Sequence, residues 1–151
     1  NADPFENLDA DKITATSEII TYNQEDWNKE HVYVNLGLMG LDILSDKQVY
    51  NVGAWGGPAN LVQEMCIDIY LLSVGKLKVA DQTSFNYLIQ TKYKDQTKFT
   101  TLEDKFAVHL HVINAGLVAF DLNTVSHYKI VHQYDRIPNF KRYSRLQKMM
   151  R

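Results

Sequence analysis

Hydrophobic and polar positions along the chain predict an alternation of short strands and amphipathic helices. Five segments are short and rich in β-branched or alternating apolar residues, which is typical of strands. They are residues 12–17, 48–55, 98–101, 106–113 and 127–133. Four others repeat apolar residues every three or four positions, which indicates helices. They are residues 27–40, 58–75, 81–93 and a last helix from 138 onward. The expected order, β-α-β-α-α-β-β-β-α, is that of an α/β chain.

The first two helices are each expected to pack through one apolar stripe. In the first helix the stripe comprises Trp27, His31, Val34, Leu38 and Leu41. In the second it comprises Leu61, Met65, Ile69 and Leu72. Pro58 suits the first turn of that second helix, and Gly75 suits its end. Cys66 lies beside the second stripe and is expected to be a buried structural thiol.

Composition narrows the function classes. The 151 residues are 45% hydrophobic and 23% charged, which fits one globular domain with a real core. A net charge of -2 gives no electrostatic argument for nucleic acid or a membrane surface as a partner. No stretch approaches the ~20 apolar residues of a membrane span. The single cysteine cannot form an internal disulfide, which favours a reducing, cytoplasmic compartment.

Polar residues gather at two predicted junctions, where an element ends and a helix begins. Asn51 and Gly53 precede the second helix, and Asp81, Gln82 and Asn86 open the third. Ends of strands are where open α/β sheets build their sites, and amides and carboxylates match the hydroxyls of sugars. Simpler interpretations stay open: aspartate is a common helix N-cap, and Asn and Gly are ordinary turn residues.

The histidines differ in what they predict. His132 lies at the end of an apolar strand near Arg136, where imidazole could ligate a cation and Arg could meet phosphate oxygens. A plain salt bridge between Asp135 and Arg136 is the alternative. His109 and His111 share a strand face but lack clustered acidic neighbours. His31 is expected to be structural.

Several common catalytic motifs are missing from the sequence. It holds no phosphate-binding Gly-x-x-x-x-Gly-Lys-Ser/Thr loop, no Gly-x-Gly-x-x-Gly and no Gly-x-Ser-x-Gly elbow. Kinase-like, NAD-dependent and serine-hydrolase functions therefore lack support.

Three segments in order resemble those of one enzyme family. Residues 51–57, Asn-Val-Gly-Ala-Trp-Gly-Gly, are similar to an Asn-Ala-Gly-Val segment, and residues 81–86, Asp-Gln-Thr-Ser-Phe-Asn, to an Asp-Gln-x-x-Leu-Asn segment. Residues 131–136 resemble a late histidine motif. Together with residues 3–5 and 16–18, they make the chain similar to the C-terminal part of a GT-A-type glycosyltransferase, after its metal-binding Asp-x-Asp.

This resemblance implies a GT-A-like, Rossmann-like mixed sheet flanked by helices, without the N-terminal nucleotide-binding βαβ half. Residues 1–151 would form one partial glycosyltransferase domain, and the opening of the chain reads like the middle of a longer protein. Asp9-Ala10-Asp11 has the letters of the metal motif but follows Pro4-Phe5 and no apolar strand, so it is expected to be a loop.

The resemblance also implies partners and residue roles. A divalent metal (Mn or Mg) would neutralise the diphosphate of a nucleotide-diphosphate sugar, and a carbohydrate or other hydroxyl would be the acceptor. Asp81 and Gln82 would act in catalysis, and His132 would bind the metal. The substrate-binding residues would be Asn51, Gly53, Trp55, Asn86, Tyr134 and Arg136, with Trp55 and Tyr134 as stacking faces.

Two other functions stay open. A non-catalytic carbohydrate-binding or interaction domain with a degenerate GT-A-like fold is motivated by the missing Asp-x-Asp. A hydrolase would use Glu18 and Asp81 as a carboxylate pair, which requires a separation of ~5–10 Å. Neither the sugar, the nucleotide, the acceptor nor the stereochemical outcome follows from the sequence.

Overall fold

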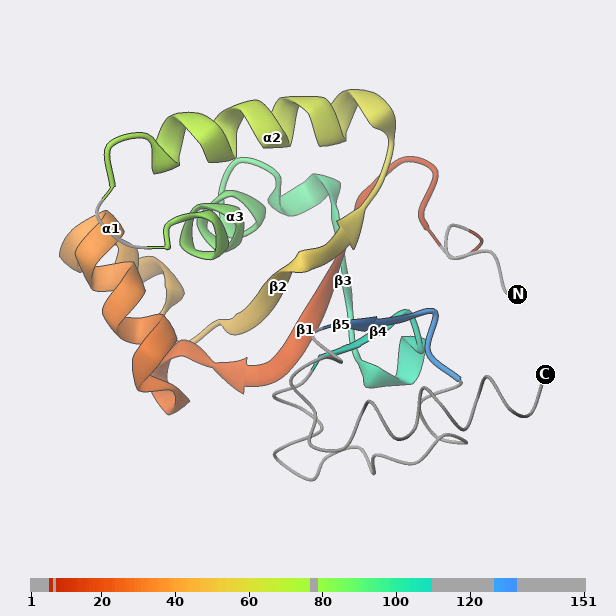
Figure 1. Cartoon of the computed structure of the whole chain (residues 1–151), viewed down its shortest axis with the longest axis horizontal. Coiled ribbons are helices and arrows are strands. Elements are labelled where there is room, and N and C mark those ends of the chain that lie inside the picture. The colour runs from red at the N-terminus through yellow and green to blue at the C-terminus, as the bar shows by residue number, and fades with distance from the viewer. Residues whose placement is uncertain (1–5, 7, 77–78, 110–126, 133–151) are drawn as a thin grey trace, which may run out of the picture.

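The main sheet has three strands in the order β2-β1-β3 (Figure 1). A computed structural model describes residues 6, 8–76, 79–109 and 127–132 of the chain. The strands are β1 (Ile13–Thr21), β2 (Gln48–Gly56) and β3 (Thr97–Thr100). β2 runs antiparallel to β1, whereas β3 runs parallel to it. The predicted α/β class with a mixed sheet is therefore confirmed.

Three α-helices and a second pair of strands lie around this sheet. The helices are α1 (Asp26–Leu44), α2 (Ala59–Ser73) and α3 (Asp81–Gln90). Short 3-10 helices are η1 (Tyr22–Gln24), η2 (Lys94–Gln96) and η3 (Leu102–Asp104). Strands β4 (Ala107–His109) and β5 (Ile130–His132) pair in parallel. Figure 1 shows the helices on one side of the main sheet and the β4-β5 pair on the other.

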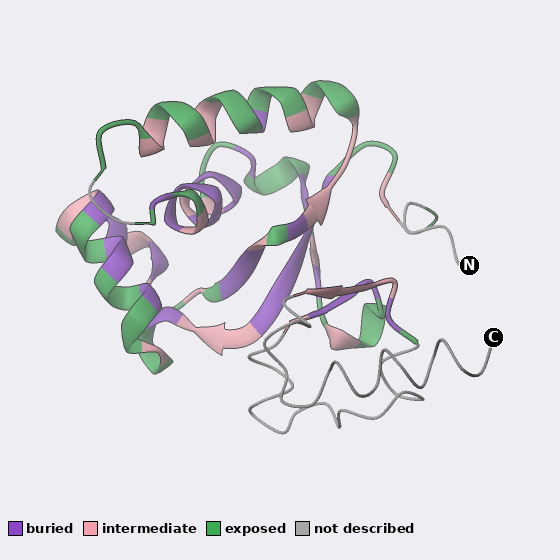
Figure 2. Ribbon diagram, in the orientation of Figure 1, coloured by how far each residue is buried: buried purple, intermediate pink, exposed green. Residues whose placement is uncertain are grey.

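The largest apolar cluster lies between the sheet and the pair α2 and α3. Met65 of α2 and Phe85 of α3 are fully buried there, against Ile13 of β1. The predicted stripe of α2 faces this cluster, while its outer surface is exposed (Figure 2). Cys66 is exposed, so the prediction of a buried thiol is wrong. It follows Met65 by one residue, which is about 100° around the helix and away from the core.

The predicted stripe of α1 is wrong at three of its five positions. Trp27, Val34 and Leu38 are 47%, 42% and 75% exposed, whereas His31 is buried and Leu41 packs against an apolar cluster. The buried face instead includes polar side chains, among them Asn28 and Asn35. Gly37, with φ 68°, breaks the helical geometry, so one continuous stripe cannot form across it. The polar face of α1 therefore needs polar partners, and these are found at the cavity described below.

Strand β1 is longer than the predicted strand 12–17: it extends to Thr21, so Glu18 lies inside the strand and not just after its end. Asn51 lies in the middle of β2, within the predicted strand 48–55. Near it, the pairing with β1 slips from Ala15 opposite Trp55 to Ser17 opposite Tyr50. Extra residues on β2 at this irregularity turn its side chains locally. Among the described residues no strand separates α2 from α3, in agreement with the predicted order.

Several predictions fall on residues outside the described ranges. These are the strand residues after His109, His111 included, the residues Tyr134 and Arg136, and the helix from Pro138. Residues 9–11 form the predicted loop, where the Asp11 N–H donates to Asp9 Oδ1 at 2.9 Å. Among the described helices, none combines the length and apolar character needed to cross a bilayer.

Candidate functional site

A cavity of about 520 Å³ lies where β1, β2, β4, β5 and the N-terminal ends of α1 and α3 meet. Its volume is within the range of small-molecule sites, ~300–1,000 Å³. Twelve residues line it: Glu18, Glu25, Trp27, Asn28, Asn51, Val52, Gly53, Val79, Asp81, Gln82, His109 and His132. The fold thus brings together five of the predicted site residues, which come from β2, α3 and β5.

Glu18 is the buried centre of this cavity, with 4% of its surface exposed. Its Oε1 accepts hydrogen bonds from Asn51 Nδ2 at 2.8 Å and from Gln82 Nε2 at 3.3 Å. His109 Nε2 lies 3.9 Å from the same oxygen. A buried carboxylate is costly unless polar partners stabilise it, and these contacts do so. Glu18 is therefore held in one place by side chains from three other elements.

A continuous chain of hydrogen bonds crosses the cavity through Glu18. From Gln82, Nε2 also donates to Asn28 Oδ1 at 3.1 Å, and Asn28 Nδ2 donates to Glu25 Oε2 at 2.9 Å. At the other end, Asn51 Oδ1 accepts the Gly53 N–H at 2.7 Å. We call Glu25, Asn28, Gln82, Glu18 and Asn51 the polar chain.

The polar chain fixes the orientation of every amide in it. A carboxylate only accepts and a backbone N–H only donates, so Asn28, Gln82 and Asn51 can each be oriented in one way. Gln82 uses its amide nitrogen on Glu18 and Asn28, which leaves Oε1 without a partner among the described residues. Gln82 is half-buried, and its amide nitrogen makes both donations.

Strained backbone stands directly beside Glu18. Ile19 has φ 58°, a left-handed conformation that β-branched residues rarely adopt. Ser17 Oγ accepts the Ile19 N–H at 2.9 Å and donates to Gln48 Oε1 at 2.8 Å, which supports this turn of the chain. Such strain persists only where surrounding contacts enforce it, and it is common at functional sites.

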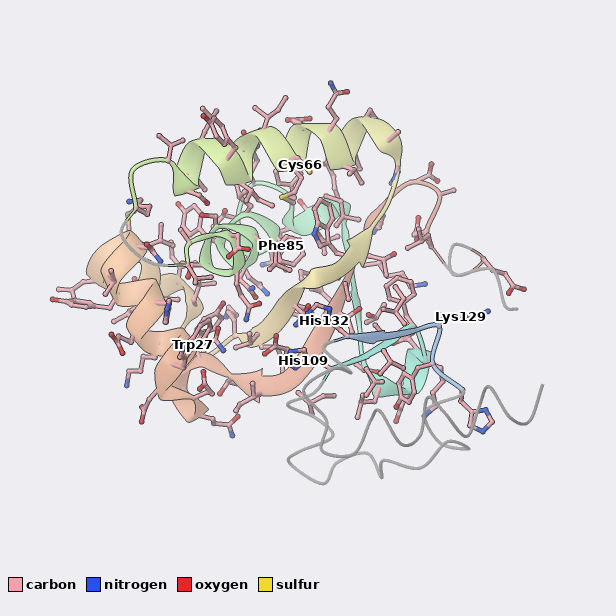
Figure 3. The ribbon with its side chains drawn as sticks, in the orientation of Figure 1. Trp27, Cys66, Phe85, His109, Lys129 and His132 are labelled. Carbon is pink, nitrogen blue, oxygen red and sulfur yellow. The ribbon has the colours of Figure 1, made fainter. Side chains whose placement is uncertain are left out.

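His132 lies against β2 because residue 53 is glycine. A Cβ on Gly53 would overlap the imidazole ring of His132. His132 also stacks on His109, with ring centroids 5.5 Å apart and an interplanar angle of 20°. Figure 3 shows the side chains of His109 and His132 next to each other beside β1 and β2, and Trp27 at α1. The spacing of residues along the chain does not predict that Gly53 and His132 are in contact.

Asp81 lines the cavity from the first turn of α3. It is exposed, and its Oδ1 accepts the Gln82 N–H at 2.9 Å. The N-cap position belongs to Ala80, so Asp81 is not the helix cap. The N-terminus of a helix favours negative charge, which suits a carboxylate in contact with solvent or ligand.

Two predicted substrate-binding residues lie away from the cavity. Asn86 is fully buried and bonds the Tyr50 backbone twice, accepting from N and donating to O at 2.7 Å each. It therefore ties α3 to β2. Trp55 packs on Phe85, with ring centroids 5.2 Å apart, as part of the apolar cluster. Neither residue is among those that line the cavity.

The carboxylates of the polar chain influence the neighbouring Tyr22. Burial, then Glu18, then Glu25 raise the pKa of its phenol well above the usual value. Its hydroxyl has no hydrogen-bond partner among the described residues. The site thus has negative character, which favours hydroxyl donors over anionic groups at this end.

The described residues do not assemble a metal centre. No group of three or more His, Cys, Asp or Glu side chains within the described ranges could hold a metal ion. His132 would therefore need ligands beyond the part of the chain that the structure describes. Hard cations such as Mn²⁺ or Mg²⁺ require several oxygen ligands.

Sequence reasoning missed the α1 side of the site. Trp27 was assigned to a packing stripe, and Glu25 and Asn28 were assigned no role in binding. One signal was present: Glu25 caps α1 by accepting the N–H groups of Trp27 and Asn28, and its acidic side chain precedes the helix in the sequence. No family model, curated protein or solved structure matches this chain.

Proposed function

We propose that this chain carries the sugar-binding part of a GT-A-type glycosyltransferase site, which transfers a sugar from a nucleotide-diphosphate donor to a hydroxyl acceptor. The observation that carries the proposal is the convergence of Asn51, Asp81 and Gln82 with His132 around buried Glu18 in one cavity. These residues come from three separate segments that resemble family motifs. A random polar surface would not be expected to gather them.

The chemistry of the lining supports a hydroxyl-rich ligand. Glu18 and the amides of the polar chain provide acceptors and donors with fixed directions, which is how polar groups orient a ligand. Asp81 stands at the solvent-facing edge, where it can take the proton of the acceptor hydroxyl. As that oxygen bonds to the anomeric carbon, the bond to the diphosphate breaks and the diphosphate leaves with the electron pair. Positioning of the two reactants supplies much of the rate.

Metal dependence through His132 belongs to this proposal, with Mn or Mg as the cation. Because the described residues do not complete a metal site, no step above depends on the ion. His132 would contribute one ligand, and the stacked His109 would limit its movement.

A transfer assay with a panel of nucleotide-diphosphate sugars tests the proposal. Asp81→Asn should lower the transfer rate by ~10²-fold or more, as expected for loss of a general base. Asp95→Asn is a matched control, because Asp95 lies on η2 and outside the cavity. Normal transfer by Asp81→Asn would remove its catalytic role, and metal-dependent donor binding that survives His132→Ala would remove His132 as a ligand.

The second candidate is a non-catalytic carbohydrate-binding domain with the same cavity. It is motivated by the missing metal-binding Asp-x-Asp in the sequence. It predicts saccharide binding with neither donor hydrolysis nor transfer. For the hydrolase hypothesis, Glu18 and Asp81 line the same cavity, and glycosidases need one protonated and one ionised carboxyl. The amide donors on Glu18 stabilise its charged form, so Asp81 would have to be the acid.

A further inference from the structure

Trp27 is a large aromatic side chain that lines the cavity and is nevertheless 47% exposed. Its indole is supported from behind by His31, with ring centroids 3.9 Å apart and an interplanar angle of 30°. His31 is itself buried, and its Nδ1 lies 2.6 Å from the Trp27 carbonyl oxygen. One face of the indole therefore packs against the His31 ring, and its other face is available to contact a ligand.

The groups next to Trp27 are polar and directional. Glu25 accepts the backbone N–H groups of Trp27 and Asn28, and Asn28 is buried within the polar chain. An aromatic face beside a carboxylate and an amide matches a pyranose, which has an apolar C–H face and hydroxyls around its edge. An alkyl chain would contact one aromatic surface and would exclude water from the polar side chains beside it, which disfavours a lipid alcohol.

Trp27 and His132 mark two separate sides of the cavity. Figure 3 shows Trp27 at α1, away from the pair formed by His109 and His132. Gln82 and Glu18 link the two sides through the polar chain. Under the proposed function, the His132 side receives the diphosphate end of the donor, so the Trp27 side is left for the acceptor.

We infer that Trp27 is a stacking platform for a pyranose ring and that the acceptor is a saccharide. The assignment of that ring as the acceptor rests on the proposed function, whereas pyranose binding at Trp27 does not. Trp27 is a specificity-determining residue in this inference, because it touches the ring and not the reacting atoms.

Intrinsic fluorescence tests the platform without requiring transfer. The chain has two tryptophans, and Trp55 is packed against Phe85. The methyl pyranosides of galactose, glucose and mannose are titrated into the full chain, with glycerol as a hydroxyl-rich compound that lacks a ring. At least one pyranoside should change the emission saturably, and the change should vanish in Trp27→Phe, whose remaining indole is Trp55. No change with any pyranoside overturns the inference.

Acceptor kinetics test the identity of the ligand. With saccharide acceptors, Trp27→Ala should raise KM by about tenfold, equivalent to about 1.4 kcal/mol. Trp27→Phe should stay near the wild-type KM because it keeps an aromatic face. Tyr33→Ala is the matched control, since Tyr33 is an exposed aromatic of α1 that does not line the cavity. A serine-containing peptide should be a poor acceptor for all variants.

The outcomes separate the two proposals. If Trp27→Ala transfers sugar with an unchanged KM for the saccharide, the stacking role of Trp27 is wrong and the transferase function stands. Better transfer to the peptide than to any saccharide also overturns it. Pyranoside binding at Trp27 without donor binding or transfer supports the platform and overturns the transferase.

Discussion

The apolar cluster under α2 and α3 and the polar cavity beside α1 are both buried, but they are built differently. In the cluster, Met65 and Phe85 fill space, and their contacts are non-directional. In the cavity, Glu18 and Asn51 are almost as buried, yet their positions depend on hydrogen bonds with one allowed orientation. The first region stabilises the fold, and under the proposed function the second orients a ligand.

Helix α3 contributes to both regions, and the difference between its residues is instructive. Gln82 and Asn86 are one turn apart and both carry amides. Asn86 uses its amide on the backbone of β2, so it belongs to the fold. Gln82 uses its amide on Glu18 and Asn28 at the cavity. An amide at a helix start is therefore a weak guide to binding until its partners are known.

The largest expected effect separates the two regions directly. Phe85→Ala should lower the free energy of unfolding by about 3–5 kcal/mol, because it leaves a cavity in the apolar cluster. Glu18→Gln is similar in size to glutamate and should change it by about 1 kcal/mol or less while reducing ligand binding. Urea unfolding measures both values. A larger stability loss in Glu18→Gln than in Phe85→Ala would show that the cavity, too, mainly stabilises the fold.

Asn86→Ala should have the next largest effect. It leaves the N–H and the carbonyl of Tyr50 without their side-chain partner, and each buried group costs about 1–3 kcal/mol. Thermal unfolding should show the loss, with Gln90→Ala of the same helix as a near-neutral control. A stable Asn86→Ala variant with weakened sugar binding would instead support the role predicted from sequence.

Strain at Ile19 predicts a smaller and unusual result. Glycine adopts φ 58° without a steric penalty, so relief of strain should offset the lost side-chain contacts in Ile19→Gly. Its unfolding free energy should change by about 1 kcal/mol or less. Ile20→Gly is the matched comparison: Ile20 packs on an apolar cluster and does not share the positive φ, so it should lose more. Equal losses would argue against strain beside Glu18.

The smallest effect concerns pH and appears only in alkaline solution. Burial, with the hydrogen bond to Asp68, raises the pKa of Tyr93 to about 12 from 10.0. Because its pKa is higher in the folded than in the unfolded state, the Tyr93 phenol stabilises the fold at pH values below its unfolded pKa. This contribution to stability is lost as the pH rises from about 10 to 12. Tyr93→Phe should therefore lessen the fall in stability across that window, without abolishing it, because Tyr22 is shifted in the same direction. An unchanged pH slope in Tyr93→Phe would contradict this.

The sequence predicted the elements better than their environments. The apolar stripe of α2 was predicted correctly because Leu61, Met65 and Ile69 recur on one face of the helix. Such a period can be read from neighbouring positions in the sequence without knowledge of distant contacts. For α1 the same logic failed, because its buried face is polar and is paired with distant side chains. The proximity of His132 to Gly53 depends on strand pairing between remote segments, which spacing alone does not encode.

Amide chemical-shift mapping with a nucleotide-diphosphate sugar reports directly whether the cavity binds the donor. We expect perturbations at Glu18, Asn51, Gly53 and Gln82, with residues of α2 unaffected. We also expect Glu18→Gln to remain folded and to show weaker perturbations. The absence of perturbations at the cavity for every donor tested, or their concentration on α2, would contradict this expectation.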